Sequence, residues 1–456
     1  MASDLLSIGR SGAQAARVAL DVTAQNIANA SSDGYVRRSA RLAEVSSTGG
    51  MGAVGDVSLS GVRLEGVVRN ADLFRQAEVR RTGADAARAD AEVAGLENVQ
   101  AAVEQSNVYN AMVGFEGSLQ QLVGDPTSAS LRANVIESAR TMVGTFNIAA
   151  SALDAVGTGL GFEATDAITQ VNTLSGELAR VNLRLARAAD ASSDQTSLLD
   201  QRDSLLQQLS AFTDVSTRIN ADATVELRLG GASGPLMVQG GSAGTLGMTT
   251  AGDGTLSFAV SGFTAAPAAP AAAALTGGSL AGKAQALVKL AAVHARLDSL
   301  ADTMAATVNA AQTAGITPAN AAGQPLFGGG APFTAASLTL ALTDGAGIAT
   351  APASAGANSR DATNLNALRT ALGSADPVGG MDALLFDISG TVQGRTVTRD
   401  ALRTIANGAQ VSLQAQAGVD LDQEAVNLVR FQQAFQASGK VMQTAKDIFD
   451  TLLAIR

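Results

Sequence analysis

The sequence predicts a mainly α protein with an inserted β-rich domain. Apolar or small residues recur in steps of 3 and 4 at both ends of the chain, as in helices that form a coiled coil. Several long segments between the ends keep the same helical spacing, which predicts a layer of bundled long helices. Two glycine-rich stretches with short alternating runs interrupt that layer, and these predict small β or irregular insertions.

The N-terminal segment from Asp4 to Ala30 contains no proline, and most of its residues are small or aliphatic. Its heptad positions are apolar or small, namely Leu6, Gly9, Ala13, Ala16, Leu20, Thr23, Ile27 and Ala30. Asn26 and Asn29 lie near these positions, where a polar side chain can fix the register of a coiled coil at some cost in stability. This thin apolar face predicts a helix that partner helices can approach closely.

The C-terminal segment predicts a helix of about 35 residues that runs to Arg456. Asp420 is a suitable N-cap, Gln423 occupies the reaching-back position of a capping box, and acids in the first turn suit the helix dipole. A strict 3-4 spacing joins the large apolar positions of this helix, namely Leu428, Phe431, Phe435, Ser438, Met442, Ala445, Phe449 and Leu452.

Further helices are predicted between the two ends. Residues 74–104 form one long, alanine-rich pattern. Asp125 and Pro126 predict an N-cap and first helical residue for a segment that runs to Leu153 and ends at Gly157 and Gly159. The remaining helical patterns lie at residues 168–185, 198–212 and 287–311.

Short alternating runs predict strands. Val57–Leu59 and Val62–Val67 suggest an early hairpin, and later runs lie at 225–229, 256–260 and 338–342. The predicted organisation has a terminal coiled-coil region at 1–35 and 420–456, a helical domain with a small hairpin at 36–212, 279–314 and 381–419, a β-rich insertion at 213–278, and an outer Gly/Ala/Pro-rich insertion at 315–380.

Composition excludes several classes of chemistry. The 456 residues suffice for about three domains. A net charge of -10, from 41 acidic and 31 basic residues, argues against a nucleic-acid binder. The absence of Cys excludes disulfides, thiol nucleophiles and Cys-ligated metals, and a single His, His294, excludes a multi-histidine metal site. We therefore expect no cofactor, no metal and no catalytic residue.

The start of the chain does not resemble a secretory signal, because Asp4, Arg10 and Arg17 interrupt any apolar core. No apolar run approaches the roughly 20 residues needed to cross a bilayer. We expect a soluble protein without membrane contact, or one exported by a route that needs no cleaved signal.

Both ends resemble the axial proteins of the bacterial flagellum. Residues 24–38, AQNIANASSDGYVRR, resemble their shared NIANASTPGYxR element, with Ser32 and Asp33 in place of the usual Thr-Pro. Residues 418–438, GVDLDQEAVNLVRFQQAFQAS, are similar to their GVNLDEEAANLxxYQQAYQAS element. Hook, rod and junction proteins share both elements, so these ends indicate the superfamily rather than one member.

Internal segments narrow the resemblance to the FlgK family of hook-associated proteins. Residues 198–210, LLDQRDSLLQQLS, resemble the LLDQRDxLLxxLS segment of that family, and residues 125–128 with the following helix also match it. The helix from Gly282 to Ala311 and the loop residues 315–316 and 324–327 are similar to its post-insertion helix and loop. The likeness covers about two thirds of the chain, excluding both insertions.

The resemblance implies a non-enzymatic structural protein of the hook–filament junction. It implies export through the flagellar type III apparatus, assembly into a homo-oligomeric ring, contact with the hook protein and a second junction protein, and an export chaperone on the C-terminal helix. The expected assembly interface comprises Leu6, Ala13, Ala16, Leu20, Asn26, Ile27, Asn29, Leu428, Phe431, Phe435, Met442, Ala445, Phe449 and Leu452. The expected hinge comprises Gly34, Tyr35 and Arg37, although an ordinary turn would also explain them.

Several other features that could suggest a binding or catalytic site have a simpler structural explanation. His294 sits on the apolar stripe of its helix and is interpreted as a core or interfacial residue. Asp420, Asp422 and Glu424 begin like a calcium loop but lack its glycine and final Glu, so capping is favoured. Gly230-Gly231 and residues 345–347 are interpreted as turns, because no phosphate-loop context follows. Residues 265–275 are interpreted as a linker or loop tip.

Two other functions stay open. Another axial protein (hook, rod or second junction protein) would share the ends but lack the long helical layer. A secreted cell-wall hydrolase would need two carboxylates held about 5–9.5 Å apart, and residues 315–380 offer only Asp344, Asp361 and Asp376, with no recognisable pair. An intramolecular core helix is the plain alternative for the C-terminal stripe. We expect instead that both ends are loose in the free monomer and become ordered among neighbouring subunits.

Overall fold

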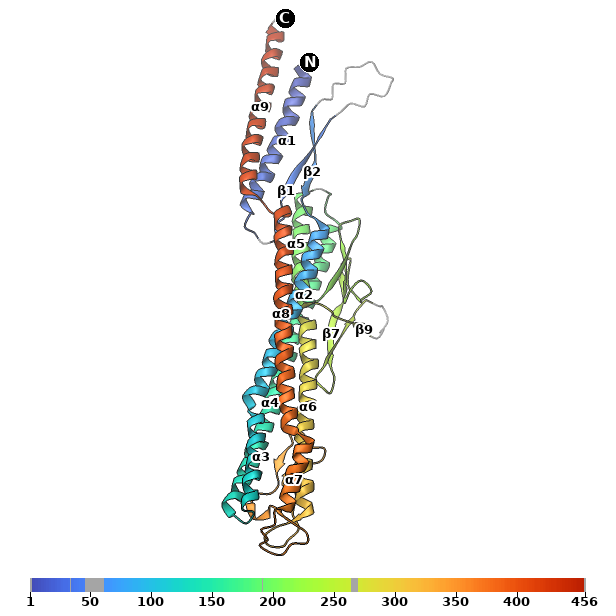
Figure 1. Ribbon diagram of the computed structural model, residues 1–456. Coiled ribbons are helices and arrows are strands. Elements are labelled where there is room, and N and C mark those ends of the chain that lie inside the picture. The colour runs from blue at the N-terminus through green and yellow to red at the C-terminus, as the bar shows by residue number, and fades with distance from the viewer. Residues whose placement is uncertain (1, 33, 46–60, 191, 264–269, 455–456) are drawn as a thin grey trace.

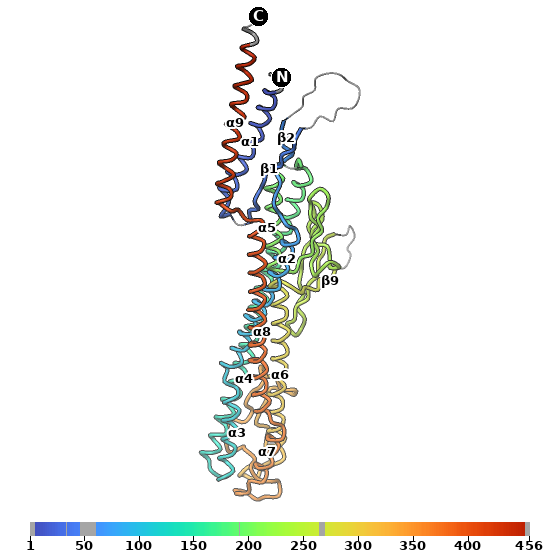
Figure 2. Tube along the Cα trace, turned by 45° about the horizontal axis from the view of Figure 1, so that its top comes forward, coloured from blue at the N-terminus to red at the C-terminus, as the bar shows by residue number. Residues whose placement is uncertain are grey.

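A computed structural model describes residues 2–32, 34–45, 61–190, 192–263 and 270–454. The molecule is a long rod in which most helices run along one axis (Figures 1 and 2). The first and last described helices project together from one end, so the two termini lie close together. A mainly α protein with small β insertions is therefore confirmed.

The long helices account for the rod. The described part of the chain contains α1 Ala2–Ala28, α2 Leu73–Ser106, α3 Val108–Gly124, α4 Ala129–Leu185, α5 Ser193–Phe212, α6 Gly278–Ala314, α7 Thr363–Ala375, α8 Pro377–Ala417 and α9 Leu421–Ala454, with a 3-10 turn, η1, at Gly345–Gly347.

The strands form small antiparallel sheets. Their bounds are β1 Arg38–Glu44, β2 Val62–Arg69, β3 Val215–Ile219, β4 Val225–Leu229, β5 Leu236–Gln239, β6 Ser242–Ala243, β7 Thr245–Thr250, β8 Leu256–Ser261, β9 Ala271–Ala273, β10 Gly315–Ile316, β11 Phe327–Gly328, β12 Thr339–Leu340 and β13 Ala351–Pro352. Sheets β3-β4-β5-β6 and β7-β8-β9 form the main insertion, and β1–β2, β10–β13 and β11–β12 are pairs.

Two predictions about helix α4, its N-cap and its C-terminal end, were wrong. Its N-cap is Ser128, whose hydroxyl accepts from the Leu131 backbone N–H, whereas Asp125 accepts from Thr127 in the preceding turn. The helix also continues through Gly157 and Gly159 for 57 residues. A glycine costs a helix about 1 kcal/mol, and the continuously buried face of α4 offsets that cost.

The early hairpin is also corrected. Strand β2 contains the predicted run at 62–67, but it pairs with β1, with Ala40 opposite Val67. Residues 57–59 lie outside the described residues. The segment 38–44 has little strand-like alternation, so its pairing depends on the tertiary contacts around it rather than on its own pattern. Helices α3 and α7 were not predicted.

Two hydrophobic clusters hold the rod together. One lies in the half away from the termini and joins α3, α4, α6, α7 and α8 around Phe115, Phe146 and Met304. The other joins the C-terminal half of α4, α5 and the main β insertion around Leu178 and Leu227. Helix α4 contributes to both clusters, so it links the two ends of the rod.

The segment 315–362 closes the end of the rod away from the termini, where its short strands cover the helix ends. Buried Arg132 of α4 holds this segment, donating to the carbonyls of Gly345 and Ile348 and to the hydroxyl of Thr350. Residues 230–231 and 345–347 form turns, as predicted. Residues 265–269 of the predicted loop tip lie outside the described residues, and its residues Ala271–Ala273 are not a loop but strand β9, paired with β8. No described helix is long and apolar enough to span a membrane.

Candidate functional site

The terminal helices α1 and α9 pack side by side along most of their length (Figure 1). Glycines in α1 allow this approach. A Cβ on Gly9 would lie 2.7 Å from Met442 Cγ and 3.2 Å from the Ser438 carbonyl oxygen, and a Cβ on Gly12 would lie 2.8 Å from Ser438 Oγ. The small-residue face of α1 therefore receives the larger side chains of α9.

The pair buries only part of the predicted interface. Ala16, Asn26 and Ala445 are buried. Ala13, Leu20, Ile27, Asn29, Leu428, Phe431 and Met442 are half-buried. Leu6 is 44% exposed, Phe435 44% and Phe449 54%. Leu452 belongs to α9, and its side chain lies outside the described part of the molecule.

Large apolar side chains of α9 thus remain open to solvent along the outer side of the pair. Leu421, Val426 and Val429 are also more than half exposed. Contiguous exposed apolar surface on a helix marks a contact that another molecule completes. The face of α1 that packs against α9 carries Gly and Ala rather than Leu or Phe. Its side chains are therefore too small to cover these residues.

Asn26 joins the terminal pair to the rod. Its side-chain oxygen accepts from Tyr35 Oη at 2.9 Å and from the Arg38 backbone N–H at 3.0 Å. Its amide donates to the Arg38 carbonyl at 2.8 Å and to Glu424 Oε2 at 3.2 Å. These four bonds use the full capacity of an Asn side chain. One buried residue therefore ties α1, the segment after it, and α9 together.

Glu424 completes this junction from α9. Its carboxylate is buried and accepts from Arg37 Nε at 2.7 Å. The Arg37 backbone N–H also donates to the carbonyl of Ala417, the last residue of α8. Asp420 caps α9 as predicted, accepting from the backbone N–H groups of Asp422 and Gln423. Glu424 was expected to act in capping as well, but it bonds across to α1 and Arg37.

A second ionic cluster lies directly below this junction. Arg38 of β1 and Arg69 of β2 contact Asp200 of α5, at 2.7 and 2.8 Å. Arg69 also contacts Asp203, at 2.9 Å, and Arg202 contacts Asp203 at 2.8 Å. The cluster fixes the β1–β2 hairpin to α5. Sequence reasoning missed it, although its members lie in the segments 36–38 and 198–210 that carry the family resemblance.

The pKa values of Asp200 and Asp203 shift in opposite directions. Burial raises the pKa of Asp200, and Arg69 and Arg38 offset this only in part. Burial acts on Asp203 in the same direction, but Arg202 and Arg69 outweigh it and hold the pKa of that carboxyl below its ordinary value. Burial also raises the pKa of Tyr35. The paired, ionised Asp203 is the stabilising charge of the cluster.

The expected hinge residues lie at this joint. Gly34 has a φ of +75°, a left-handed conformation that favours glycine. Tyr35 packs under the Arg38 guanidinium at 5.1 Å. A cavity of about 750 Å³ lies next to them, lined by residues of α2, α5 and α8 including Arg80, Gln207 and Leu413. The terminal pair thus meets the rod through a narrow polar joint beside an open space.

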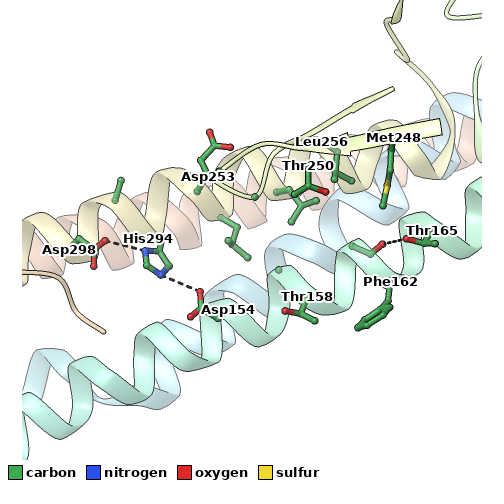
Figure 3. Close-up of a pocket in the computed structure, with 18 residues that line it drawn as sticks. Asp154, Thr158, Phe162, Thr165, Met248, Thr250, Asp253, Leu256, His294 and Asp298 are labelled. Carbon is green, nitrogen blue, oxygen red and sulfur yellow. Dashed lines mark hydrogen bonds and ion pairs between the residues drawn. The ribbon is translucent and has the colours of Figure 1, made fainter. Parts of the chain in front are cut away.

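His294 lies on α6 at the edge of another cavity, of about 730 Å³, between α4, α6 and the β7–β8 hairpin (Figure 3). Its Nε2 lies 3.5 Å from Asp154 and its Nδ1 lies 3.3 Å from Asp298. Within the described ranges, no group of three or more His, Asp or Glu side chains could hold a metal ion. His294 is therefore an interfacial residue between two helices.

The carboxylates considered for hydrolysis have structural roles. Asp344 accepts from the Ala346 N–H, Asp361 from Thr363, and Asp376 from the Gly379 N–H at the start of α8. Each therefore holds a turn or a helix start.

The paired terminal helices and the long helical layer have the architecture of an axial structural protein. The family comparisons agree with this class. The model of the flagellar hook-associated protein FlgK helical domain matches residues 93–327. Models of the flagellar basal body rod protein and of the FlgEFG C-terminal region match residues 6–35 and 414–455. The chain belongs to the FlgK family of flagellar hook-associated proteins, and it is a structural protein rather than an enzyme.

Named relatives support the assignment. Flagellar hook-associated protein 1 of Bacillus subtilis is 23% identical, over 98% of this chain and 97% of its own length. The Salmonella typhimurium protein of the same name is 27% identical over 52% of this chain, and the match spans only 43% of that protein. The Escherichia coli protein is 26% identical over the same share of each chain.

A solved structure, the flagellar hook junction protein FlgK from Burkholderia pseudomallei, matches 55% of this chain and 47% of its own, with 24% identity and a TM-score of 0.47. The family places this chain in the bacterial flagellum, where it assembles with other axial components.

Proposed function

We propose that this chain is a junction protein that connects the hook of the flagellum to the filament. The observation that carries the proposal is the uncovered apolar surface of α9, where Phe449 is 54% and Phe435 is 44% exposed although both helices of the pair are present. Contiguous exposed apolar surface of this kind marks a contact with another molecule. The homologous hook-associated proteins indicate where in the flagellum that contact lies.

In this proposal, residues 1–35 and 420–456 of many copies form an inner tube. The helical residues 36–212, 279–314 and 381–419 form the layer around it, and the insertions 213–278 and 315–380 face outward. The subunits form a homo-oligomeric ring that contacts the hook protein on one side and the second junction protein on the other. The exposed positions of α1 and α9 are the contacts between copies.

The joint at Asn26, Gly34, Tyr35 and Arg37 has a mechanical role in this proposal. Among the described residues, the terminal helices meet the rod at this polar junction, beside a cavity of about 750 Å³, and where α1 packs against the β1–β2 hairpin. Small changes of angle there would let the layer follow a curved hook while the inner tube keeps its register, which Asn26 fixes.

The proposed route of export also involves the exposed apolar surface of α9. We propose that the chain leaves the cell unfolded through the flagellar type III apparatus. Before export, the apolar positions of α9 need a cover, and a chaperone bound to this helix would supply it. Assembly then replaces the chaperone with neighbouring copies.

A deletion of residues 429–456 tests the proposal. The remaining chain should stay folded, because both hydrophobic clusters lie outside α9. It should fail to join the flagellum, as seen by gold labelling of the protein between hook and filament in cells that lack their own copy. A truncated protein that restores motility contradicts the proposal, as does full-length protein labelled along the hook or rod instead.

A further inference from the structure

The rod itself carries two uncovered apolar faces on different sides. We infer that the outer face of α8 in one copy packs against the outer face of α4, and the groove beside it, in a second copy of this chain. This inference deepens the proposed function and depends on it, since it states which surfaces make the side-by-side contact between copies.

The face of α8 that points away from the rod is apolar and exposed. Phe386, Val397 and Val411 are 81%, 61% and 64% exposed. Small exposed residues continue the 3-4 spacing between them, namely Ala401, Thr404 and Gly408. A Cβ added at Gly408 would meet nothing within 4 Å. These six positions, here the α8 face, form a helical stripe that no other described part of this chain covers.

Helix α4 carries a matching face. Ile148 and Phe162 are 60% and 69% exposed. Ala155 and Gly159, both exposed, lie between them at helical spacing. These four positions are the α4 face. Phe162 also lines the cavity of about 730 Å³ between α4, α6 and the β7–β8 hairpin, so the face borders a groove lined by both apolar and polar side chains, among them Met248 and Asp154 (Figure 3).

The two faces lie on different sides of one rod. Helices α4 and α8 both pack against α2 and α6. The two helices lie on opposite sides of α6. On one side Lys289 of α6 pairs with Asp387 of α8, and on the other His294 of α6 approaches Asp154 of α4. A molecule with two different complementary faces makes head-to-tail contacts that repeat from copy to copy, in a closed ring or along an open helical array. This arrangement favours a second copy as the occupant.

The charges beside the faces are complementary. Arg395 and Arg403 flank the α8 face and are 50% and 54% exposed. Each pairs with a carboxylate of α2 through Nε alone, so terminal N–H donors of the guanidinium remain. Between Arg140 and Arg180, α4 carries acids but no Lys or Arg, and exposed Asp166 continues the helix beyond Phe162. In the inferred contact, the guanidinium donors beside the α8 face of one copy would meet the carboxylates beside the α4 face of the next.

The α8 face also continues the surface of the terminal helices. Helix α8 ends at Ala417 and α9 begins at Leu421, and the two helices run nearly end to end along the molecule (Figure 2). Exposed Val411 of α8 is thus followed by exposed Leu421 and Val426 of α9. Copies placed side by side through α9 would bring their α8 faces against the next rod. Small residues in both faces permit the close helix approach of about 8–10 Å that such packing needs.

Cysteine cross-linking in assembled flagella tests the contact, and the absence of native Cys makes every link assignable. Val397→Cys is combined in turn with Ile148→Cys, Ala155→Cys or Phe162→Cys, which sample about 21 Å along α4. With a short bis-maleimide, a head-to-tail contact predicts a ladder of multimers in at least one double variant and monomers in every single variant. Dimers of Val397→Cys alone, or no ladder in any double variant, would overturn the inference.

A matched pair of substitutions provides the second readout. Val397→Arg places a charge in the α8 face, whereas Thr398→Arg places it one residue away, about 100° around the helix. Both variants should keep the wild-type circular dichroism and melting temperature. The inference expects at least a tenfold loss of incorporated protein for Val397→Arg and little loss for Thr398→Arg; equal incorporation overturns it. Wild-type label absent from the junction would instead refute the proposed function.

Discussion

Asn26 of α1 and Glu424 of α9, 398 positions apart in the chain, are joined by a hydrogen bond of 3.2 Å. Each belongs to one of the two terminal elements that resemble other axial proteins. The bond explains why those elements occur together, since the N-terminal one supplies the amide and the C-terminal one supplies the buried carboxylate. The two elements build a single joint between the terminal helices and the rod.

Asn26→Ala should impair assembly more than Asn29→Ala does. The first change removes four hydrogen bonds and leaves the buried Glu424 carboxylate with one partner fewer, at a cost of about 1–3 kcal/mol. Asn29 is half-buried, donates to the Gln25 carbonyl one turn earlier and accepts from the Ser32 hydroxyl at 3.4 Å, so its bonds stay within the end of α1 and the turn after it. We expect roughly tenfold less Asn26→Ala protein in purified flagella by quantitative immunoblot, and near wild-type amounts of Asn29→Ala. Equal amounts of the two variants in flagella would show that assembly does not depend on the hydrogen bonds of Asn26.

Gly9→Val should separate the terminal helices. Its side chain would collide with Met442 and with the Ser438 backbone, whereas a Cβ added at Gly439 of α9 would meet nothing within 4 Å. Gly439→Val is therefore the matched control within the pair. A Gly9→Cys/Met442→Cys disulfide reports the native pairing, and it should form readily in assembled flagella. Assembly of Gly9→Val at wild-type level would show that the helices do not pack through Gly9.

The ionic cluster predicts a dependence of stability on pH. The pKa of Asp203 is depressed in the fold, so this residue stabilises the protein above the unfolded value of about 3.9, and the contribution is lost as pH falls through the folded pKa. Asp200 opposes this trend, because its raised pKa makes protonation favour the fold.

Asp203→Asn should therefore lower the free energy of unfolding by about 3 kcal/mol at pH 7, because it leaves the buried Arg202 without a carboxylate partner and leaves Arg69 with Asp200 alone. The difference from wild type should shrink below pH 4. Urea unfolding at pH 7 and pH 3 measures both values. Glu137→Gln, which alters a carboxylate that is 68% exposed, is the control and should differ little from wild type at either pH. A constant difference across the range would contradict the role given to Asp203.

Two phenylalanines separate stability from assembly. Phe146 is fully buried in the cluster of α3, α4 and α6, and Phe386 is 81% exposed on α8. Phe146→Ala should cost about 3–5 kcal/mol in chemical denaturation. Phe386→Ala should leave the free energy of unfolding within about 0.5 kcal/mol of wild type. A large loss of stability for Phe386→Ala would mean that its side chain packs within its own molecule.

The sequence predicted the mainly α fold well because spacing and capping are local. The heptad positions of α9 and the Asp420 cap were evident from neighbouring residues, and both are present. The end of a helix at Gly157 was predicted wrongly, because the burial that carries α4 past that glycine comes from distant elements.

The joint was predicted only in outline. Gly34, Tyr35 and Arg37 were expected to form a hinge. The neighbouring Arg38 pairs with Asp200, which lies 162 positions away in the chain, and no periodicity links residues so far apart. The same limit applies to Glu424, whose place in a first turn suggested capping. Its burial against Arg37 follows from the pairing of the two ends.

The central claim is that the apolar side chains of α9 that its pairing with α1 leaves exposed, such as Phe435 and Phe449, are covered by other copies. Amide hydrogen exchange of residues 425–450, in the isolated monomer and in assembled flagella, tests it most directly. We predict exchange within seconds to minutes in the monomer, and protection by at least a hundredfold after assembly. Strong protection of these residues in the isolated monomer would contradict the account.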